Sequence, residues 1–214
     1  MRRSRNIPIK AKTRYAFVVD GECEFWYVQM LKRNERSINV NLEPKIPQRK
    51  KLSEQYELVL ELSKDYKEVF WIIDFDVINS ETRSAKKGSK TAIVEFKEYC
   101  NTIEKEHENI HVIVNNPCLE FWILLHFETT SRYYENCEQV IDHLKKKKYL
   151  PDYEKSQKYY TKQGNDIYLK LKPTLKTAIA NAKKLGAFDF ENIHIGLSQM
   201  QIVFESDDLK KLIE

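Results

Sequence analysis

Short apolar runs alternate with helix-like segments through the first 128 residues of the chain. The runs are rich in β-branched and aromatic residues, which favour buried strands, and the intervening segments carry apolar residues at helical spacing. We expect strands at 15–19, 38–46, 69–73 and 110–114, and helices at 22–34, 53–66, 91–106 and from 116 onward. This alternation predicts an α/β fold with a mostly parallel sheet flanked by helices.

No linker or internal repeat divides the chain into separate domains. The 214 residues include only 5 glycines and 6 prolines, and no Ser/Gly-rich stretch occurs. We therefore expect a single domain over residues 1–214, with an α/β core at about 15–128 and a mainly helical C-terminal part at about 129–214. A last strand is expected within 193–204, before a short terminal helix.

Capping signals mark two of the predicted helix starts. Ser53 is a suitable N-cap for the second helix, and Asn116 followed by Pro117 places a capping residue before a proline at the first helical position. Between Asp76 and Lys90 the sequence is polar and lysine-rich, and we expect a loop there.

The four cysteines are far apart in the sequence and form no C-x-x-C motif: Cys23, Cys100, Cys118 and Cys137. Such sparse thiols fit a reducing compartment better than a disulfide framework, and no Cys/His pair has zinc-ligand spacing. The basic N-terminus is not followed by an apolar signal segment, and the densest apolar run, 121–127, is too short to span a bilayer. The expected localisation is the cytoplasm, without a membrane partner.

Polar residues follow the carboxyl ends of several predicted strands. Asp20 follows the first strand, Asp74 and Asp76 follow the third, and Asn116 follows the fourth. Right-handed crossovers place the carboxyl ends of parallel strands along one edge of the sheet, which is where such sheets bind ligands. These residues are therefore expected to meet at one site.

Asp74 and Asp76 are two residues apart, directly after five apolar residues. In extended backbone, residues i and i+2 point to the same side, so both carboxylates could converge on one cation. Two close carboxylates repel each other, and a Mg²⁺ or Mn²⁺ ion would remove that conflict. The alternative is that both are ordinary strand-end and turn residues. We predict a metal site of Asp20, Asp74 and Asp76.

Acidic residues also surround the end of the first strand. Gly21 is expected to allow a tight turn after Asp20, and Glu22 and Glu24 fall in the first helical turn. Acidic residues there also complement the helix macrodipole, which is the alternative reason for their presence. Glu24 and Glu120 are candidates for the outer shell of the metal site, and for Glu120 a purely dipolar role remains an equal alternative.

The chain resembles the RloB-like family, which is itself related to Toprim-type folds. Three stretches carry the resemblance: Val18–Glu24, Ile72–Asp76 and Asn116–Phe127. The third is the most specific, because its Asn-Pro-Cys-x-Glu-x-Trp string followed by His-Phe is not explained by helix patterning. The resemblance implies a Toprim-like central sheet and a metal site built from an acidic residue after the first strand and a D-x-D pair after a later one.

By position in the family pattern, Asp74 and Asp76 match the metal-binding pair, and Asp20 stands where the family usually has glutamate. Glu22 or Glu24 could compensate for the shorter side chain. The resemblance implies metal-assisted cleavage of phosphodiester bonds in DNA or RNA, with Mg²⁺ or Mn²⁺ as cofactor and Asp20, Glu22, Asp74 and Asp76 as catalytic residues. It also implies a role in antiphage defence, beside an ABC- or AAA-type ATPase partner.

Basic and aromatic residues suggest how nucleic acid would be held. The loop after Asp76 carries four basic residues expected to contact the phosphate backbone: Arg83, Lys86, Lys87 and Lys90. The lysine run at 145–148 is expected to be a solvated helix face. Three tyrosines among lysines could stack on bases, although a role in covering a helix is commoner: Tyr153, Tyr159 and Tyr160. His126 and the tryptophans, Trp26, Trp71 and Trp122, are expected to lie in the core.

Two other functions fit parts of the sequence. The stretch 71–77 also matches the first motif of haloacid-dehalogenase-like phosphatases, but that motif normally begins a domain, and 206–208 is a poor match for the later acidic pair. Alternatively, the chain could be a non-catalytic module that binds nucleic acid or docks on an ATPase, with a degenerate metal site. Function belongs to the site rather than to the fold, so the site must decide between them.

Overall fold

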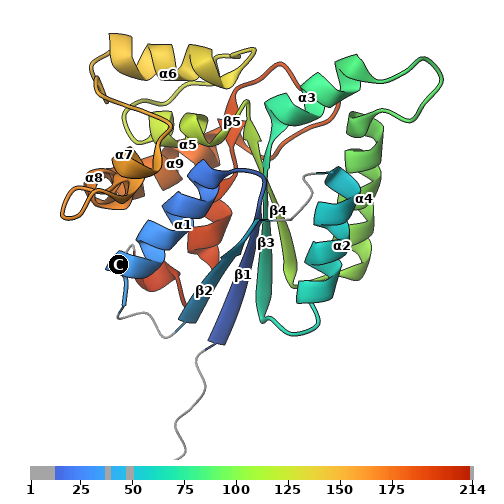
Figure 1. The fold of residues 1–214 in the computed structure, drawn as a ribbon, viewed down its shortest axis with the longest axis horizontal. Helices are drawn as coiled ribbons and strands as arrows, with labels where there is room; N and C mark the ends of the chain where they lie inside the picture. Colours follow the sequence, from blue (N-terminus) through green and yellow to red (C-terminus); the bar gives the residue numbers. More distant parts are fainter. Residues whose placement is uncertain (1–12, 37–39, 47–50, 213–214) are drawn as a thin grey trace, which may run out of the picture.

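A five-stranded sheet in the order β2-β1-β3-β4-β5 forms the centre of the computed structural model, which describes residues 13–36, 40–46 and 51–212 (Figure 1). The strands are β1 (Thr13–Val19), β2 (Val40–Lys45), β3 (Glu68–Asp74), β4 (Ile110–Asn116) and β5 (Leu197–Ser198). The first four pair in parallel, and only β5 is antiparallel to its neighbour. The predicted mostly parallel sheet is confirmed.

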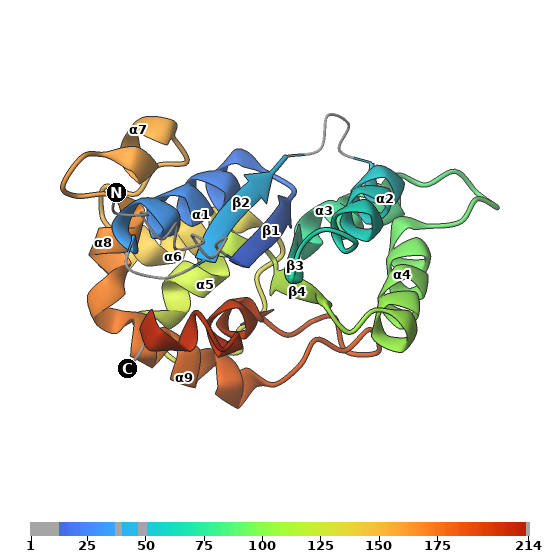
Figure 2. The same ribbon diagram turned by 90° about the horizontal axis from the view of Figure 1, so that it is seen from below.

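Helices cover both faces of this sheet, as predicted (Figure 2). One face packs against α2 (Leu52–Leu62), α3 (Phe75–Ser84) and α4 (Ala92–Glu106). The other face packs against α1 (Glu22–Asn34), α5 (Leu119–Leu125) and the C-terminal helices. Those are α6 (Cys137–Lys146), α7 (Gln157–Thr161), α8 (Ile167–Leu171), α9 (Leu175–Leu185) and the 3₁₀ helices η1 (Lys172–Thr174), η2 (Met200–Glu205) and η3 (Lys210–Leu212).

The two apolar cores follow from the two-residue period of the strands. In β3, Phe70 and Ile72 face the core under α1 and α5, whereas Val69, Trp71 and Ile73 face the core under α2 and α4. All five are at most 2% exposed, so the continuous apolar sequence of β3 reflects burial on both faces.

The local predictions at two helix starts are wrong. α2 begins at Leu52 with Lys51 at its N-cap, so Ser53 already lies inside the helix. The Asn116–Pro117 peptide bond is cis, and α5 begins only at Leu119, with Cys118 at the N-cap. The Asn116 side chain instead donates to the carbonyls of Ile193 and Ile195, which tertiary contacts alone provide.

Residues 75–84 form α3, where a loop was expected, and the loop is confined to the residues between α3 and α4. The apolar residues Phe75 and Ile78 explain the helix, because they are buried against the sheet at i and i+3. Near the C-terminus the expected strand is reduced to Leu197–Ser198, and the following residues form η2. Residues 38 and 39 of the predicted second strand lie outside the described part of the chain.

A disulfide joins Cys118 to Cys137, contrary to the expectation that the cysteines stay unpaired. The two residues are 19 positions apart in the sequence, but α5 and α6 begin side by side, so both helix starts present their cysteine to the same point. Cys23 and Cys100 are free. No described helix is both long enough and apolar enough to cross a bilayer.

Candidate metal centre

The carboxyl ends of β1 and β3 open into a pocket of about 470 Å³. It lies where the chain leaves these strands for α1 and α3, at the edge of the sheet that the sequence predicted (Figure 1). The pocket is lined by Asp20, Gly21, Glu22, Cys23, Glu24, Trp26, Ile46, Asp74, Val77 and Lys155. Three of the four predicted catalytic residues, Asp20, Glu22 and Asp74, therefore border the same space.

Asp74 ends β3, and its Oδ1 accepts a hydrogen bond of 3.0 Å from the backbone N–H of Leu119. This bond fixes the carboxylate against the start of α5. Burial raises the pKa of Asp74 well above its ordinary value, and the nearby carboxylates of Glu24 and Glu120 raise it further. Asp74 is thus a desolvated carboxyl group surrounded by like charges.

Asp76 lies in the first turn of α3 rather than in extended backbone, so the expected strand-type alignment with Asp74 is wrong. Its backbone N–H donates to the carbonyl of Pro117 over 3.0 Å, which ties the start of α3 to the cis-proline segment. Burial raises the pKa of Asp76, Lys155 opposes this, and Glu120 adds to it. Asp76 therefore belongs to the same electrostatic cluster by a different local geometry.

Glu24, a predicted outer-shell residue, is only 3% exposed. Burial and the Glu120 carboxylate raise its pKa to about 7. Gly21 makes room for it, because a Cβ at that position would lie 2.7 Å from Glu24 Oε2. The φ of Gly21 is −134°, which any residue adopts, so its role is close approach rather than the tight turn that we expected.

The Asp20 side chain is held by a residue of α2, on the other face of the sheet. Its Oδ1 accepts a hydrogen bond of 2.9 Å from Gln55 Nε2, and Gln55 Oε1 accepts one of 2.9 Å from the buried indole N–H of Trp71. Burial and the Asp20 carboxylate raise the pKa of Glu81 on α3, which places a further acid near this corner. Glu22, by contrast, is exposed to solvent at the rim of the pocket.

Glu120 is fully buried and holds the inner wall of the cluster. Its Oε1 accepts a hydrogen bond of 2.6 Å from Tyr153 and lies 3.3 Å from Lys155 Nζ, while its Oε2 lies 2.7 Å from the disulfide sulfur of Cys137. A purely dipole-related role for Glu120 does not account for these contacts.

Lys155 is a pocket residue that the sequence did not predict. It lines the pocket and lies 3.3 Å from Glu120 Oε1. Burial lowers its pKa, but the carboxylates of Glu120, Asp74 and Glu24 outweigh that effect and raise the pKa overall. No sequence motif includes this lysine, because it is 35 residues from Glu120 in the sequence and only the fold brings the two together. The only sequence feature that could have indicated Lys155 is its position between Tyr153 and Tyr159, two tyrosines that are buried in the core.

The donor set suits a hard divalent cation, because the pocket is lined by carboxylates with one lysine as counter-charge. The carboxylates do not close a full shell. Among the described residues, the only three His, Cys, Asp or Glu ligand atoms within 4.8 Å of one another belong to Cys118, Glu120 and Cys137, and both cysteines are in the disulfide. Mg²⁺ usually binds through one or two carboxylates and keeps several waters, which matches this spacing.

The predicted nucleic-acid contacts are partly engaged elsewhere. Arg83 pairs with Glu135 at 3.1 Å, and Lys90 pairs with Glu98. Lys86 and Lys87 are exposed in the loop between α3 and α4, which projects at the same end of the sheet as the pocket (Figure 1). The lysines at 145–148 are exposed at the end of α6, as expected for a solvated face.

Aromatic residues that the sequence left open are in the interior. Tyr153 and Tyr160 are 0% exposed and Tyr159 is 9% exposed, so they cover helices and do not offer a face for bases. Trp71 and Trp122 are fully buried in the two different cores, and the partly exposed Trp26 packs against the core that contains Trp122. His126 is buried as expected, and its Nδ1 lies 3.0 Å from Thr174 Oγ1.

The phosphatase alternative lacks its second acidic group. The Ser206 hydroxyl lies 2.7 Å from the Tyr15 hydroxyl and 3.2 Å from Glu68 Oε1, and Asp208 accepts from Tyr15. Glu68 is the first residue of β3, whereas Asp74 is the last. Residues 206–208 therefore lie at the opposite end of the sheet from Asp74 and cannot share a site with it.

The fold and the pocket define an α/β protein with a buried carboxylate site at the carboxyl edge of a parallel sheet. The chain belongs to the RloB-like protein family, because that family's model matches residues 15–201 and so covers most of the chain. The matched range contains every acidic residue of the pocket cluster, from Asp20 after β1 to Glu120 in α5. No curated protein and no solved structure matches the chain.

Proposed function

We propose that this protein is a Mg²⁺- or Mn²⁺-dependent nuclease that acts in antiphage defence. The observation that carries the proposal is the group of buried and half-buried carboxyl groups at the carboxyl edge of the sheet, with pKa values raised by desolvation and by one another. Such perturbed acids in a pocket are typical of catalytic sites. The defence role and an ATPase partner rest on what resemblance to the RloB-like family implies.

The residues divide into distinct roles. Asp74 and Asp76, with Asp20 completing the set, are the residues that would hold the ion, and a bound divalent ion supplies polarisation of the phosphate and stabilisation of the attacking and leaving oxygens. Glu24, with a pKa of about 7, can accept or donate a proton near neutral pH. Lys155 places a positive charge beside the same pocket, suited to contact a phosphate oxygen. Lys86 and Lys87 can bind the nucleic-acid backbone beyond it.

The test is metal-dependent cleavage. The purified protein is titrated with Mg²⁺ and Mn²⁺ in the presence of plasmid, single-stranded DNA or total RNA, and the products are separated on gels. We expect cleavage that the Asp74→Asn/Asp76→Asn double variant abolishes and that Glu138→Gln, an exposed change in the first turn of α6, leaves intact. Metal binding by calorimetry without cleavage in any substrate would require the assay to be repeated with an ATPase partner.

The open spacing of the carboxylates favours one alternative, a module that binds nucleic acid without cleaving it. In that case neither metal binds, nucleic acid is retained, and no substrate is cut at any metal concentration. That combination of results would overturn the nuclease proposal, and metal binding alone would not rescue it if the partner-containing assay also shows no cleavage.

A comparison of Glu22 and Glu24 tests which glutamate transfers the proton. The sequence suggested Glu22 as a catalytic residue, whereas burial and pKa favour Glu24. We expect Glu24→Gln to lower the cleavage rate by about 100-fold or more, because a general acid or base contributes about that factor. Glu22→Gln should lower it much less, because that carboxylate is exposed at the rim. The measurement is initial rate at saturating Mn²⁺, and equal losses in both variants would contradict the assignment of the proton-transfer role to Glu24.

A further inference from the structure

Within the described part of the chain, no strand pairs with most of the outer edge of β4. β5 pairs with β4 only at Asn115 and Asn116. The parallel ladder with β3 uses the backbone of alternate residues, as the bond from Val69 N–H to Asn109 O shows. Ile110, Val112 and Val114 therefore turn their N–H and C=O groups outward, away from β3.

At one end of this edge, Gln199 makes the hydrogen bonds that a partner strand would make. The Val114 N–H donates to Gln199 Oε1 over 3.2 Å, and the Val114 carbonyl accepts from the Gln199 N–H over 3.0 Å. After Gln199 the chain forms η2 and makes no further strand-like hydrogen bonds to the described part of β4. Among the described residues no hydrogen bond reaches the outward N–H of Val112.

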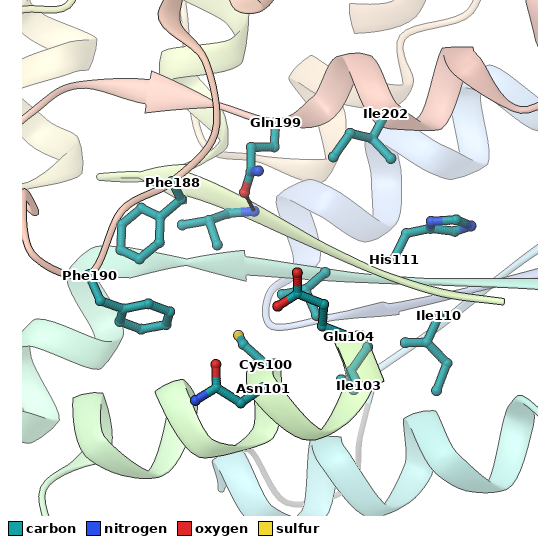
Figure 3. A pocket seen from close by; sticks show the side chains of 12 residues that line it. Cys100, Asn101, Ile103, Glu104, Ile110, His111, Phe188, Phe190, Gln199 and Ile202 are labelled. Carbon is teal, nitrogen blue, oxygen red and sulfur yellow. Dashed lines mark hydrogen bonds between the residues drawn. The ribbon is translucent and has the colours of Figure 1, made fainter. Parts of the chain in front are cut away.

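A groove of about 460 Å³ follows this edge. Figure 3 shows α4 along one side, with Phe188 and Phe190 at one end and Ile110 and His111 toward the other. A second hollow, lined in part by Glu108 and Asn109, continues it past the start of β4 and shares His111 and Ile202 with it. The groove therefore runs the length of the unpaired edge, about 13 Å at the usual rise of a strand.

The other edge of the sheet is protected and this one is not. β2 carries Pro44 and Lys45, the residue types that natural sheets use to prevent strand addition. The free part of β4 reads Ile-His-Val-Ile-Val, with no proline, lysine or bulge. An edge that offers backbone groups inside a walled groove is the geometry used for recognition of an extended peptide.

The charge of the groove indicates which peptide fits. The two hollows are lined by five carboxylates: Glu68, Glu104, Glu108, Glu205 and Asp207. Three of them already have a basic neighbour, because Glu68 contacts His111, Glu205 pairs with Lys183 and Asp207 pairs with Lys210. Among the described residues, the only lysine or arginine that lines them is Lys67, which pairs with Asp208. Glu104 and Glu108 are exposed, and among the described residues they form no ion pair. We propose that β4 binds an extended, basic segment of a partner protein by strand addition at Val112.

This surface is distinct from the carboxylate pocket and does not depend on the proposed nuclease activity. The pocket lies at the carboxyl ends of β1 and β3, whereas the groove follows the outer edge of β4. Their lining residues do not overlap.

The probe is a fluorescein-labelled heptapeptide of alternating valine and lysine, and binding is followed by fluorescence anisotropy at low and at high salt. Two control peptides accompany it: one N-methylated at alternate backbone amides, and one with glutamate in place of lysine. We expect saturable, salt-sensitive binding of the first peptide only. Failure of the first peptide to bind at millimolar concentration, or equal binding by the N-methylated peptide, would overturn the proposal.

Variants of this edge locate the binding. Val112→Pro removes the outward N–H without touching the ladder to β3, and should weaken binding about tenfold or more, since one or more backbone hydrogen bonds are lost. Val112→Thr keeps the N–H and should bind as wild type does. Glu104→Gln/Glu108→Gln should weaken binding about threefold to tenfold at low salt and less at high salt.

Amide hydrogen exchange tests the same contact without a variant. The Val112 amide should exchange fast in the free protein and become protected on adding the peptide, while the Ile113 amide, which faces β3, should be slow in both states. Protection at Val112 in the free protein, combined with a dimer by analytical ultracentrifugation that Val112→Pro dissociates, would mean that a second copy occupies the edge, and would overturn the partner assignment.

Discussion

Glu24→Gln is expected to stabilise the metal-free protein above pH 7. The pKa of Glu24 is raised from 4.5 to about 7, with burial as the main cause and Glu120 as the second. At 1.36 kcal/mol per pKa unit, the ionised form costs the folded state on the order of 3 kcal/mol at pH 8. A neutral glutamine of nearly the same shape removes that cost.

The sign of the pH dependence follows from the same shift. Between pH 4.5 and pH 7 the folded state binds the Glu24 proton and the unfolded state releases it. The wild-type contribution from Glu24 therefore becomes less favourable as pH rises through this window, and the full penalty is present above it. The stability difference between Glu24→Gln and wild type should grow from near zero at pH 4.5 to its maximum at about pH 8.

Urea unfolding from pH 4.5 to pH 8.5, with chelator present, measures this difference. Glu22→Gln is the matched control, because Glu22 is exposed in the same helical turn and its substitution should change stability little. Added Mn²⁺ should stabilise wild type more than Glu24→Gln, since the ion offsets the same repulsion. A variant less stable than wild type at pH 8 by more than about 1 kcal/mol would mean that Glu24 is already compensated in the folded protein.

The sheet could be predicted from the sequence because its strands carry their own signal. The run 69–73 is continuously apolar, and β3 is buried on both faces, so one local property decides the outcome. Asp20 and Asp74 could be predicted to lie at the same edge of the sheet, because each follows or ends a strand and the two strands are parallel. The site beyond these residues depends on segments remote in sequence. Lys155 and Tyr153 reach Glu120 from the C-terminal part, and no spacing rule connects them.

The local errors have a common physical cause, which is tertiary packing that overrides a capping or propensity signal. Asn116 bonds to the carbonyls of Ile193 and Ile195 instead of capping a helix. The 75–84 segment is polar enough to suggest a loop, yet Phe75 and Ile78 anchor it on the sheet as α3. The Cys118–Cys137 pairing depends on the approach of α5 to α6, which the sequence does not encode locally.

His126 is expected to make the protein sensitive to acid in the opposite direction from Glu24. Burial lowers its pKa from 6.5 to about 3, so the ring stays neutral in the folded state. Its Nδ1 lies 3.0 Å from Thr174 Oγ1, and its Nε2 is buried without a hydrogen-bond partner among the described residues. In the unfolded chain the ring takes up a proton below pH 6.5, and the folded state cannot.

The contribution of His126 is thus fully present above pH 6.5 and is lost as pH falls toward 3. The loss should be about 2 kcal/mol at pH 5 relative to pH 8. His126→Asn keeps a polar group near Thr174 but cannot titrate, so its stability should fall less steeply between pH 6.5 and pH 4, whatever its stability at pH 8. Urea unfolding of both proteins across this range measures the two slopes, and comparing slopes removes the packing cost of the change. Parallel slopes would show that His126 is protonated in the folded state, and that water or a shifted Thr174 reaches its ring.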